Sequence, residues 1–574
     1  MNDADRDRNI SQNNVSIIIE PADSHNSSSF SAGTFKMRIF YSIRCLLLLL
    51  ALLHSWHRLA FHTRTLIVVV VIMDDASLVD ENDEKSASLA NAADTDHASV
   101  LDGTPTFPAV SYELDVDPAQ NDRATHIKLT STKRPHMRAF HCAWISFFMA
   151  FFMWFSVSPL LGEIGRTLNL SNDQLWISTM CSDLATIMTR FIVGPMCDAY
   201  GARIPMAVVL CAASIPTALT GTINSFAGLC LVRFFVGIAG SSFVMAQYWT
   251  SRMFSRDIIG GANALVAGWG NLGGGCSQLV MGAALFPAFR EIFDGDAEKS
   301  WRLIYIFPAV VAFAVGIIIV RISNDAPQGN YQKMKKRGSM EIKQASFRTP
   351  TSTRNAVLLG ILYACSFGVE ISMNNAASLY FQDKFGQSTE SAAALASIFG
   401  ATNLFARACG GFQSDRMNRR LGMRGRLLLP TITLFLQGAS IIAFAYADTL
   451  ASAIPAMIIF SVFVNASEGA IFAVVSYVNP PITGYISGIV GCGGNVGGVL
   501  FAVAFHQTSY KNAFIVMGVL SMIAPVSSFF ISIPGYSTML SRENAFAEYH
   551  IATPTQHGES APGSVERDIT EADV

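Results

Sequence analysis

Two arginines lie deep inside long apolar runs, where a charged side chain is costly. Arg190 and Arg407 each precede by eight residues an aspartate, Asp198 or Asp415, that we expect at the cytoplasmic end of its helix. At about 1.5 Å per residue, each arginine lies about 12 Å inside a hydrocarbon core of about 30 Å. An isolated arginine there costs about 2.5–3.5 kcal/mol. A guanidinium presents a planar fork of donors, so the pair predicts a buried site for a small planar anion. Pairing with an acid that holds helices together is the alternative.

Aromatic and amide side chains occur at matching depths. Tyr363 and Phe367 lie one helical turn apart on one face, and Phe243 is a weaker candidate of the same kind. Such rings usually serve packing, but they could also cover a flat anion. Asn271 and Asn495 lie about 14–15 residues from the cytoplasmic ends of their helices. Their amides can donate hydrogen bonds to an anion.

Three carboxylates also fall within apolar runs, where acidic residues are functional candidates. Asp183 precedes Arg190 by seven residues, which places both on one helix face and makes Asp183 a candidate counter-ion. Glu370 follows Tyr363 by the same interval and is the first candidate for a proton-linked group. A structural hydrogen bond remains the alternative for both, and Glu468 is a weaker candidate still.

The elements that must position these residues are membrane-spanning helices. The chain has 574 residues, is 51% hydrophobic and only 14% charged, and its mean hydropathy is +0.37; a soluble protein has about 25% charged residues. A spanning helix needs about 20 apolar residues. Twelve segments qualify, namely 139–161, 176–197, 204–223, 226–248, 259–285, 302–321, 355–379, 392–412, 427–447, 452–475, 482–507 and 512–532. The predicted fold class is therefore an all-α membrane protein with twelve transmembrane helices.

Basic residues concentrate in the loops after alternate helices, and the positive-inside rule then places both termini in the cytoplasm. The loop after the eighth helix is the richest, with Arg416, Arg419, Arg420, Arg424 and Arg426. We expect a cytoplasmic N-terminal extension, two six-helix halves, a central cytoplasmic loop and a disordered cytoplasmic tail. Their bounds are 1–136, 137–322, 354–533, 323–353 and 534–574, respectively. Residues 1–72 are of doubtful status, since Met73 is the preferred start.

An internal repeat supports two related halves. The run with Gly194, Asp198, Gly201 and Arg203 recurs 217 residues later with Gly411, Asp415, Asn418 and Arg420. A second match relates Gly270, Asn271 and Gly274 to Gly494, Asn495 and Gly498. These glycines allow close helix contact that would let the halves rock. Duplicated six-helix units place a substrate site at their interface near the bilayer midplane.

The repeated runs also carry a family resemblance. The run from Gly194 to Arg203 resembles the loop 2–3 signature of the major facilitator superfamily. The glycine-asparagine repeats resemble the nitrate signature of its nitrate/nitrite porter family, and the likeness is nearest to the eukaryotic high-affinity branch. It covers about residues 139–533. Asn418 departs from the usual glycine of this motif, as second copies in the family often do.

The resemblance implies uptake of nitrate, with nitrite as a further substrate, across the plasma membrane. It assigns the anion clamp to Arg190 and Arg407 and the aromatic cover to Tyr363 and Phe367. Moving an anion inward against about 100 mV costs about 2.3 kcal/mol, which favours proton symport. The expected partners are nitrate, protons and the lipid bilayer. Nothing in the sequence indicates a nucleic acid, a cofactor or a metal, and no accessory subunit is identified.

Three alternatives stay open at this point. A nitrate/nitrite exchanger would use the same residues. A carrier of another small anion would keep the fold but leave the glycine-asparagine repeats unexplained. A sensor would bind nitrate without moving it. An enzyme is disfavoured, because no Ser-His-Asp or Cys-His set shares one depth.

Overall fold

The computed structural model describes residues 112–336 and 350–540. All of them belong to the unit that runs from Ile67 to Val574. The predictions about residues 1–72 and about the tail beyond residue 540 lie outside the described residues. Within them the chain is helical, apart from one short hairpin of β1 (Val116–Asp117) and β2 (Arg123–Ala124), in which Val116 pairs with Ala124.

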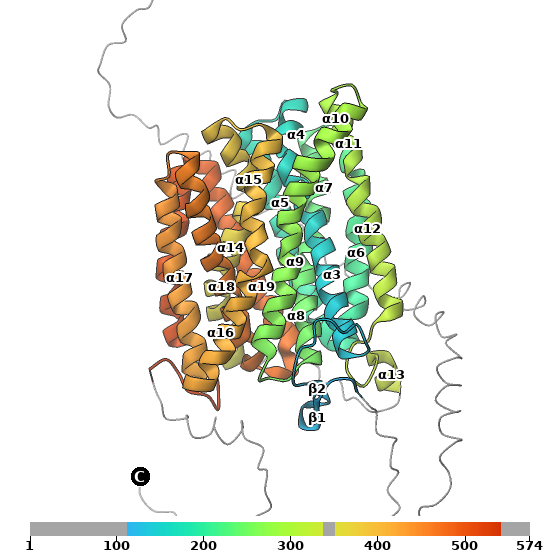
Figure 1. The fold of residues 1–574 in the computed structure, drawn as a ribbon, viewed down its shortest axis with the longest axis vertical. Coiled ribbons are helices and arrows are strands. Elements are labelled where there is room, and N and C mark those ends of the chain that lie inside the picture. Colours follow the sequence, from blue (N-terminus) through green and yellow to red (C-terminus); the bar gives the residue numbers. More distant parts are fainter. Residues whose placement is uncertain (1–111, 337–349, 541–574) are drawn as a thin grey trace, which may run out of the picture. The chain divides into compact units, whose positions relative to one another are not determined.

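The first half of the described chain forms a series of long helices with short breaks (Figure 1). In order they are η1 Pro118–Gln120, α3 His136–Phe155, η2 Ser158–Leu160, α4 Leu161–Thr167, α5 Asn172–Tyr200, α6 Arg203–Leu219, η3 Thr220–Thr222, α7 Phe226–Gly237, η4 Ile238–Ser241, α8 Ser242–Met253, α9 Ile259–Ser277, η5 Gln278–Leu285, α10 Phe286–Ile292, α11 Ala297–Ile304 and α12 Ile306–Ile322. The segment η5 is a π-helix and the other η segments are 3-10 turns.

The second part of the described chain is also a series of helices with short breaks. Its elements are α13 Tyr331–Lys336, α14 Pro350–Phe385, α15 Thr389–Ala401, η6 Thr402–Leu404, α16 Ala406–Leu421, α17 Met423–Ala445, α18 Leu450–Val478, η7 Pro480–Ile482, α19 Thr483–Gln507, α20 Tyr510–Ile523 and η8 Ala524–Phe530.

Eleven helices in the described part of the chain are long and apolar enough to cross a membrane. This confirms a multi-pass, all-helical membrane protein. The 29-residue helix α5 is not among the eleven. It carries Asp183 and Arg190 in its middle, so its lower hydropathy follows from residues that the sequence analysis singled out for function.

Local sequence explains where these helices begin and end. Ser171 caps the start of α5 in a capping box with Gln174, because the serine hydroxyl accepts a backbone N–H that the first helical turn leaves free. Gly201 ends α5 with φ +81°, and an added Cβ would lie 2.5 Å from the Asp325 carboxylate. In the second copy of the motif, α16 continues past Asn418 and ends at Gly422, whose φ is +61°. The repeat is therefore one turn longer there.

Residues 112–135, part of the predicted N-terminal extension, fold against the lower end of the helices in Figure 1. The Ser255 amide donates to the Ala124 carbonyl at 2.9 Å, and Arg134 donates to the carbonyl of Ile322 at 3.2 Å. Hydrogen bonds from Ser131 and Lys128 hold the pKa of the exposed Glu113 carboxyl below its ordinary value. This segment tethers the ends of α8 and α12.

Candidate anion-binding site

Arg190 is fully buried in the middle of α5, and the hydrogen bonds that the structure gives it all go to backbone carbonyls. Its Nε and Nη2 donate to the Gly240 carbonyl at 3.2 and 2.8 Å, and Nη1 donates to the Gly491 carbonyl. Gly240 lies in η4, where a 3-10 turn interrupts the span. Carbonyls are neutral acceptors, so none of these hydrogen bonds compensates the positive charge of Arg190. The buried carboxylate of Asp183 on the same helix attracts it without a direct contact.

Arg407 is equally buried in α16, but its partners are acidic. Its Nη1 forms an ion pair with Glu468 of α18 and lies 3.5 Å from Oε2 of Glu370. Its Nη2 donates to the Tyr363 hydroxyl at 2.9 Å. Glu468, the weakest of the three acidic candidates for a proton-linked group, is thus a direct partner of Arg407.

Glu370 of α14 is held by two amides as well as by Arg407. Asn271 donates to its Oε2 at 2.6 Å, and Asn403 donates to its Oε1 at 2.8 Å. The counterpart of Asn271 in the other half, Asn495, is also fully buried, yet neither its amide nitrogen nor its oxygen has a hydrogen-bond partner within the described ranges. The two asparagines thus differ, since one amide is occupied by a carboxylate and the other is free for a ligand.

Three aromatic rings link the two arginines. Phe243 lies 5.4 Å from the guanidinium carbon of Arg190 and 5.4 Å from that of Arg407. Phe367 lies 5.1 Å from Arg190, and it stacks on Tyr363 with ring centroids 5.1 Å apart. Cations are attracted to ring faces at this range. Phe243, the weakest of the three in the sequence analysis, is the ring that both guanidiniums share.

Asp183 does not contact Arg190 as a counter-ion would. Both of its carboxylate oxygens are buried and without a hydrogen-bond partner among residues 112–336 and 350–540. Nearby, the sequence analysis missed Arg233 of α7, which donates to Thr179 at 3.0 Å and to Asn375 of the other half at 3.0 Å. The sequence could have identified Arg233 as a candidate, because it is the single charged residue in the apolar run 226–248.

The repeated aspartates join helices that are far apart in the sequence, α5 to α19 and α16 to α9, at the lower end of the helices. Asp198 accepts backbone N–H groups of Gly484 and Tyr485 at 3.3 and 3.1 Å, at the start of α19. Asp415 accepts the Gly261 N–H at 2.7 Å, close to the start of α9. A carboxylate suits a helix N-terminus, where the N–H groups lack partners.

The arginines of the same motif lie in different places. Arg203 is buried and lies 3.6 Å from Asp325, whereas Arg420 is exposed at the end of α16. Asp415 instead pairs with Arg426 at 2.7 Å. We expected Arg416, Arg419, Arg420, Arg424 and Arg426 in a loop, and this was wrong, because α16 continues to Leu421 and α17 begins at Met423.

The glycines of the two repeats make room for aromatic rings and for neighbouring helices. A Cβ at Gly494 would lie 2.6 Å from the Phe367 ring and 2.8 Å from that of Tyr363, and a Cβ at Gly270 would overlap the Phe147 ring. The remaining glycines are also in close contact with other helices. They are Gly194 against Gly484, Gly411 against Gly260, Gly274 against Phe155 and Gly498 against Ile371.

The upper end of the helices is closed as well. Trp176 of α5 stacks on Phe505 of α19, with centroids 5.3 Å apart and planes 9° apart. Arg290 pairs with Glu390 at 3.3 Å across the halves. With contacts at both ends, the two arginines and three rings are enclosed. In the part of the chain that the structure describes, no three His, Cys, Asp or Glu side chains are placed to hold a metal ion.

These features define a polytopic helical membrane protein with a closed, charged centre between two groups of helices. The sequence profile of the Major Facilitator Superfamily matches residues 143–502, and the chain belongs to that family. Two solved structures agree with the fold. A bacterial homologue of the human lysosomal transporter Spinster, inward-facing and occupied, has a TM-score of 0.51 at 16% identity and covers 70% of this chain and 97% of its own. Its unoccupied form has a TM-score of 0.50 at 15% identity.

Similar sequences narrow the class further. High affinity nitrate transporter 2.5 of Arabidopsis thaliana is 34% identical, over 78% of this chain and 91% of the relative. High-affinity nitrate transporter 2.3 of Oryza sativa subsp. japonica is 35% identical, over 75% and 85%. Nitrate transporter 2.1 of Chlamydomonas reinhardtii is 31% identical, over 76% and 81%. The predicted family is confirmed.

Proposed function

We propose that this chain takes up nitrate, and nitrite as a second substrate, by proton symport with alternating access. One observation carries the proposal. Two fully buried guanidiniums each lie 5.4 Å from the Phe243 ring, and the one on Arg190 donates its hydrogen bonds only to neutral carbonyls. A planar anion can accept from both forks while its face rests near a ring. The relatives that share most of the chain's length bear the name of nitrate transporters.

Charge counting supports a proton at the same site. Arg190 and Arg407 contribute +2, and Glu370 and Glu468 contribute −2 when ionised, so their sum is zero. One bound nitrate makes the sum −1, and one proton on a carboxylate restores zero. A net buried charge is expensive. A proton on Glu468 would also free Arg407 to turn its donors toward the anion.

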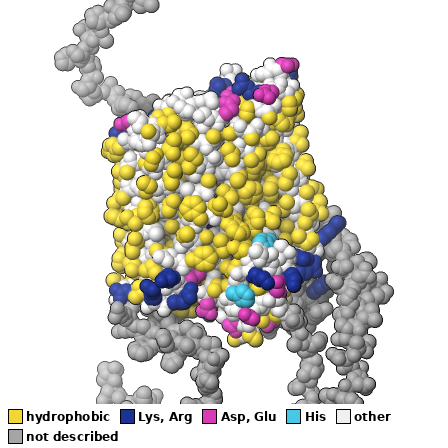
Figure 2. Space-filling view, viewed as in Figure 1, with side chains coloured by type: hydrophobic (Ala, Val, Ile, Leu, Met, Phe, Trp, Pro, Cys, Tyr) yellow, Lys and Arg dark blue, Asp and Glu magenta, His cyan; other side chains and the backbone are white. Residues whose placement is uncertain are grey.

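The architecture in this proposal has two six-helix halves, with α5 as the span beyond the eleven. Figure 2 shows an apolar belt with Lys and Arg side chains gathered below it, beneath α16, α17 and α12. By the positive-inside rule the lower end would face the cytoplasm. This orientation would place both termini in the cytoplasm, together with the extension before residue 137, the loop at 323–353 and the tail from 534. The membrane in this proposal is the plasma membrane.

Labelled nitrate flux and membrane current in proteoliposomes test the function. We expect inward current that rises as the external pH falls, because protons accompany the anion. Arg190→Lys and Arg407→Lys keep the charge and remove the planar fork, so each should lower flux at least roughly 100-fold, as loss of a buried charge-assisted pair costs about 3 kcal/mol.

Arg256→Lys, on the exposed surface after α8, is the matched control and should transport normally. Full flux in both fork variants contradicts the clamp. Flux that needs nitrite on the opposite side and ignores pH identifies the exchanger instead. Nitrate-dependent stabilisation without any flux identifies a sensor.

A further inference from the structure

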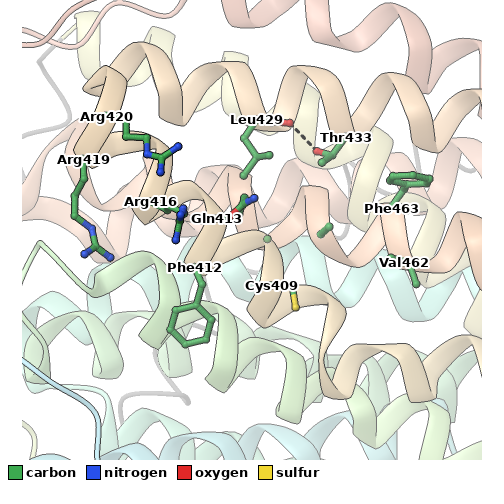
Figure 3. A pocket seen from close by; sticks show the side chains of 12 residues that line it. Cys409, Phe412, Gln413, Arg416, Arg419, Arg420, Leu429, Thr433, Val462 and Phe463 are labelled. Carbon is green, nitrogen blue, oxygen red and sulfur yellow. Dashed lines mark hydrogen bonds between the residues drawn. The ribbon is translucent and has the colours of Figure 1, made fainter.

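A groove that no step of the transport cycle uses lies on the outer side of α16, between α17 and α18 (Figure 3). Its volume is about 860 Å³. Twelve residues line it, namely Cys409, Gly410, Phe412, Gln413, Arg416, Arg419, Arg420, Leu429, Thr433, Val462, Phe463 and Ala466. It is open to the surroundings of the helices, unlike the enclosed centre, so its occupant can come from the membrane.

One end of the groove is cationic. Arg416, Arg419 and Arg420 are all exposed, and their spacing of three and four residues places them on one face of α16. The structure shows no ion pair or hydrogen bond for their guanidiniums among the residues that it describes. The contrast with Arg426 on α17, which is buried and paired with Asp415, indicates that these three charges are not used to hold the fold.

The other end of the groove is apolar. Val462 and Phe463 of α18 are half-buried at the end away from the arginines, and Phe412, which is 47% exposed, lies between them and Arg419 (Figure 3). From Arg420 to Cys409 the groove follows α16 for eleven residues. This is about 16 Å, or about half of a hydrocarbon core of about 30 Å. A groove that is cationic at the membrane surface and apolar for the depth of one leaflet has the dimensions of a single lipid.

We propose that this groove binds one anionic phospholipid of the leaflet at the lower end of the helices. The phosphate and the anionic headgroup meet the three arginines, and an acyl chain lies along Phe412, Val462 and Phe463. Basic pockets between membrane helices select anionic headgroups by charge. A soluble anion would use only the arginine end and would leave the apolar wall uncovered.

The groove is connected to the transport machinery through α16, because the same helix carries residues of the buried centre and of the contact at the lower end. Arg407 of the buried centre and Asp415, which holds the lower end closed against Gly261, both belong to α16. Phe412 itself packs at the position where a Cβ on Gly261 would lie. A lipid seated along this helix would therefore bear on the contact that must open toward the lower side.

Native mass spectrometry of the full chain in detergent, titrated with phosphatidylserine and with phosphatidylcholine, tests the site. We expect one retained phosphatidylserine and no retained phosphatidylcholine. The variant Arg416→Gln/Arg419→Gln/Arg420→Gln should bind phosphatidylserine on the order of 100-fold more weakly, at about a factor of five per arginine. Arg321→Gln/Lys333→Gln/Lys335→Gln makes the same charge change at exposed positions at the end of α12 and in α13, and should retain the lipid.

A second variant tests the apolar wall without touching the charges. Val462→Trp fills the groove, and we expect phosphatidylserine binding to fall roughly tenfold. Retention of the lipid by the triple arginine variant overturns the proposal, as does complete displacement by inorganic phosphate, which has no acyl chain. Lipid binding that appears only after the acidic residues 541–574 are deleted also overturns it and makes the chain's own tail the occupant.

Discussion

The two halves hold their buried arginines in opposite surroundings. Arg190 donates to the Gly240 carbonyl, a neutral group in the 3-10 turn η4. Arg407 pairs with Glu468 and lies beside Glu370. The repeat therefore reproduces the depth of the two guanidiniums but not their charge balance. A duplicated fold fixes where a side chain lies, and single substitutions on neighbouring helices decide what it meets there.

In the proposed symport, this difference would assign anion attraction to the helices around Arg190 and proton binding to the helices around Arg407. The first half offers a permanent positive charge that can attract an anion. The second half offers a guanidinium that a carboxylate already occupies, so an anion gains it fully only when that carboxylate is neutralised. Coupling of a proton to an anion then needs acidic residues in one half alone.

The largest expected effect separates the arginines by stability. Arg407→Ala leaves two buried carboxylates without their cation and should destabilise the protein by about 3–5 kcal/mol. Arg190→Ala leaves only carbonyl acceptors unsatisfied and should cost about 1–3 kcal/mol. Unfolding in detergent, followed by near-UV circular dichroism with denaturant, measures both. Arg407→Ala/Glu468→Gln should recover part of the loss, and equal effects of the two single variants would contradict the asymmetry.

Depth along a helix could be predicted from the sequence, but direction around it could not. Counting from Asp198 and Asp415 predicts that Arg190 and Arg407 lie deep along their helices, because helical rise fixes the axial position, and both side chains are fully buried. Glu468 lies 61 residues beyond Arg407 on another helix, and nothing in the spacing shows that they meet.

The remaining differences between prediction and structure concern the direction in which a side chain points around its helix and the residues that it meets on other helices. Asp183 shares a face with Arg190 by its spacing, but the guanidinium of Arg190 turns to η4 and α19. Arg426 resembled a loop residue, because polar residues at a helix start lower the local hydropathy. The glycine repeats were expected to permit contact, but the sequence alone did not show that rings of α3 and α14 occupy the space.

The next largest effect is expected at the matched glycines Gly494 and Gly270, which test whether the two copies of the repeat contribute equally to nitrate binding. Gly494→Ala forces a Cβ toward Phe367 and Tyr363, so we expect a higher KM for nitrate with a stability loss of about 1–3 kcal/mol. Gly270→Ala presses on Phe147 of α3, whose ring centroid lies 5.6 Å from that of Phe243, so a similar stability loss should come with a smaller rise in KM. Flux kinetics and thermal unfolding separate the two. A KM change in Gly270→Ala alone would place the substrate nearer the first half.

Glu468→Gln should have a smaller effect that is visible mainly against pH. The neutral amide mimics the protonated acid, so nitrate binding at high pH should tighten, by up to roughly tenfold, and its pH dependence should flatten. Proton-driven accumulation should disappear, while exchange of labelled for unlabelled nitrate continues.

The comparison variant is Glu370→Gln. Glu370 accepts two amides, from Asn271 and Asn403, and an amide there would face other donors, so binding should weaken at every pH. A normal pH response in Glu468→Gln with a flat one in Glu370→Gln would move the proton site to α14.

The smallest effect is expected at the upper end, where the contacts between the halves are exposed. His506 lies 3.5 Å from Asp173, and the Asp173 side chain is 67% exposed. Exposed pairs contribute about 0.2–1 kcal/mol, so Asp173→Asn should shift the balance between open and closed forms by less than about fivefold. Asp198→Asn at the lower end replaces a charge that caps α19 and should shift it further. Accessibility of single cysteines placed at each end to a membrane-impermeant thiol reagent measures both shifts. A larger shift from Asp173→Asn would mean that the exposed pair, rather than the helix-capping carboxylate, sets which side opens.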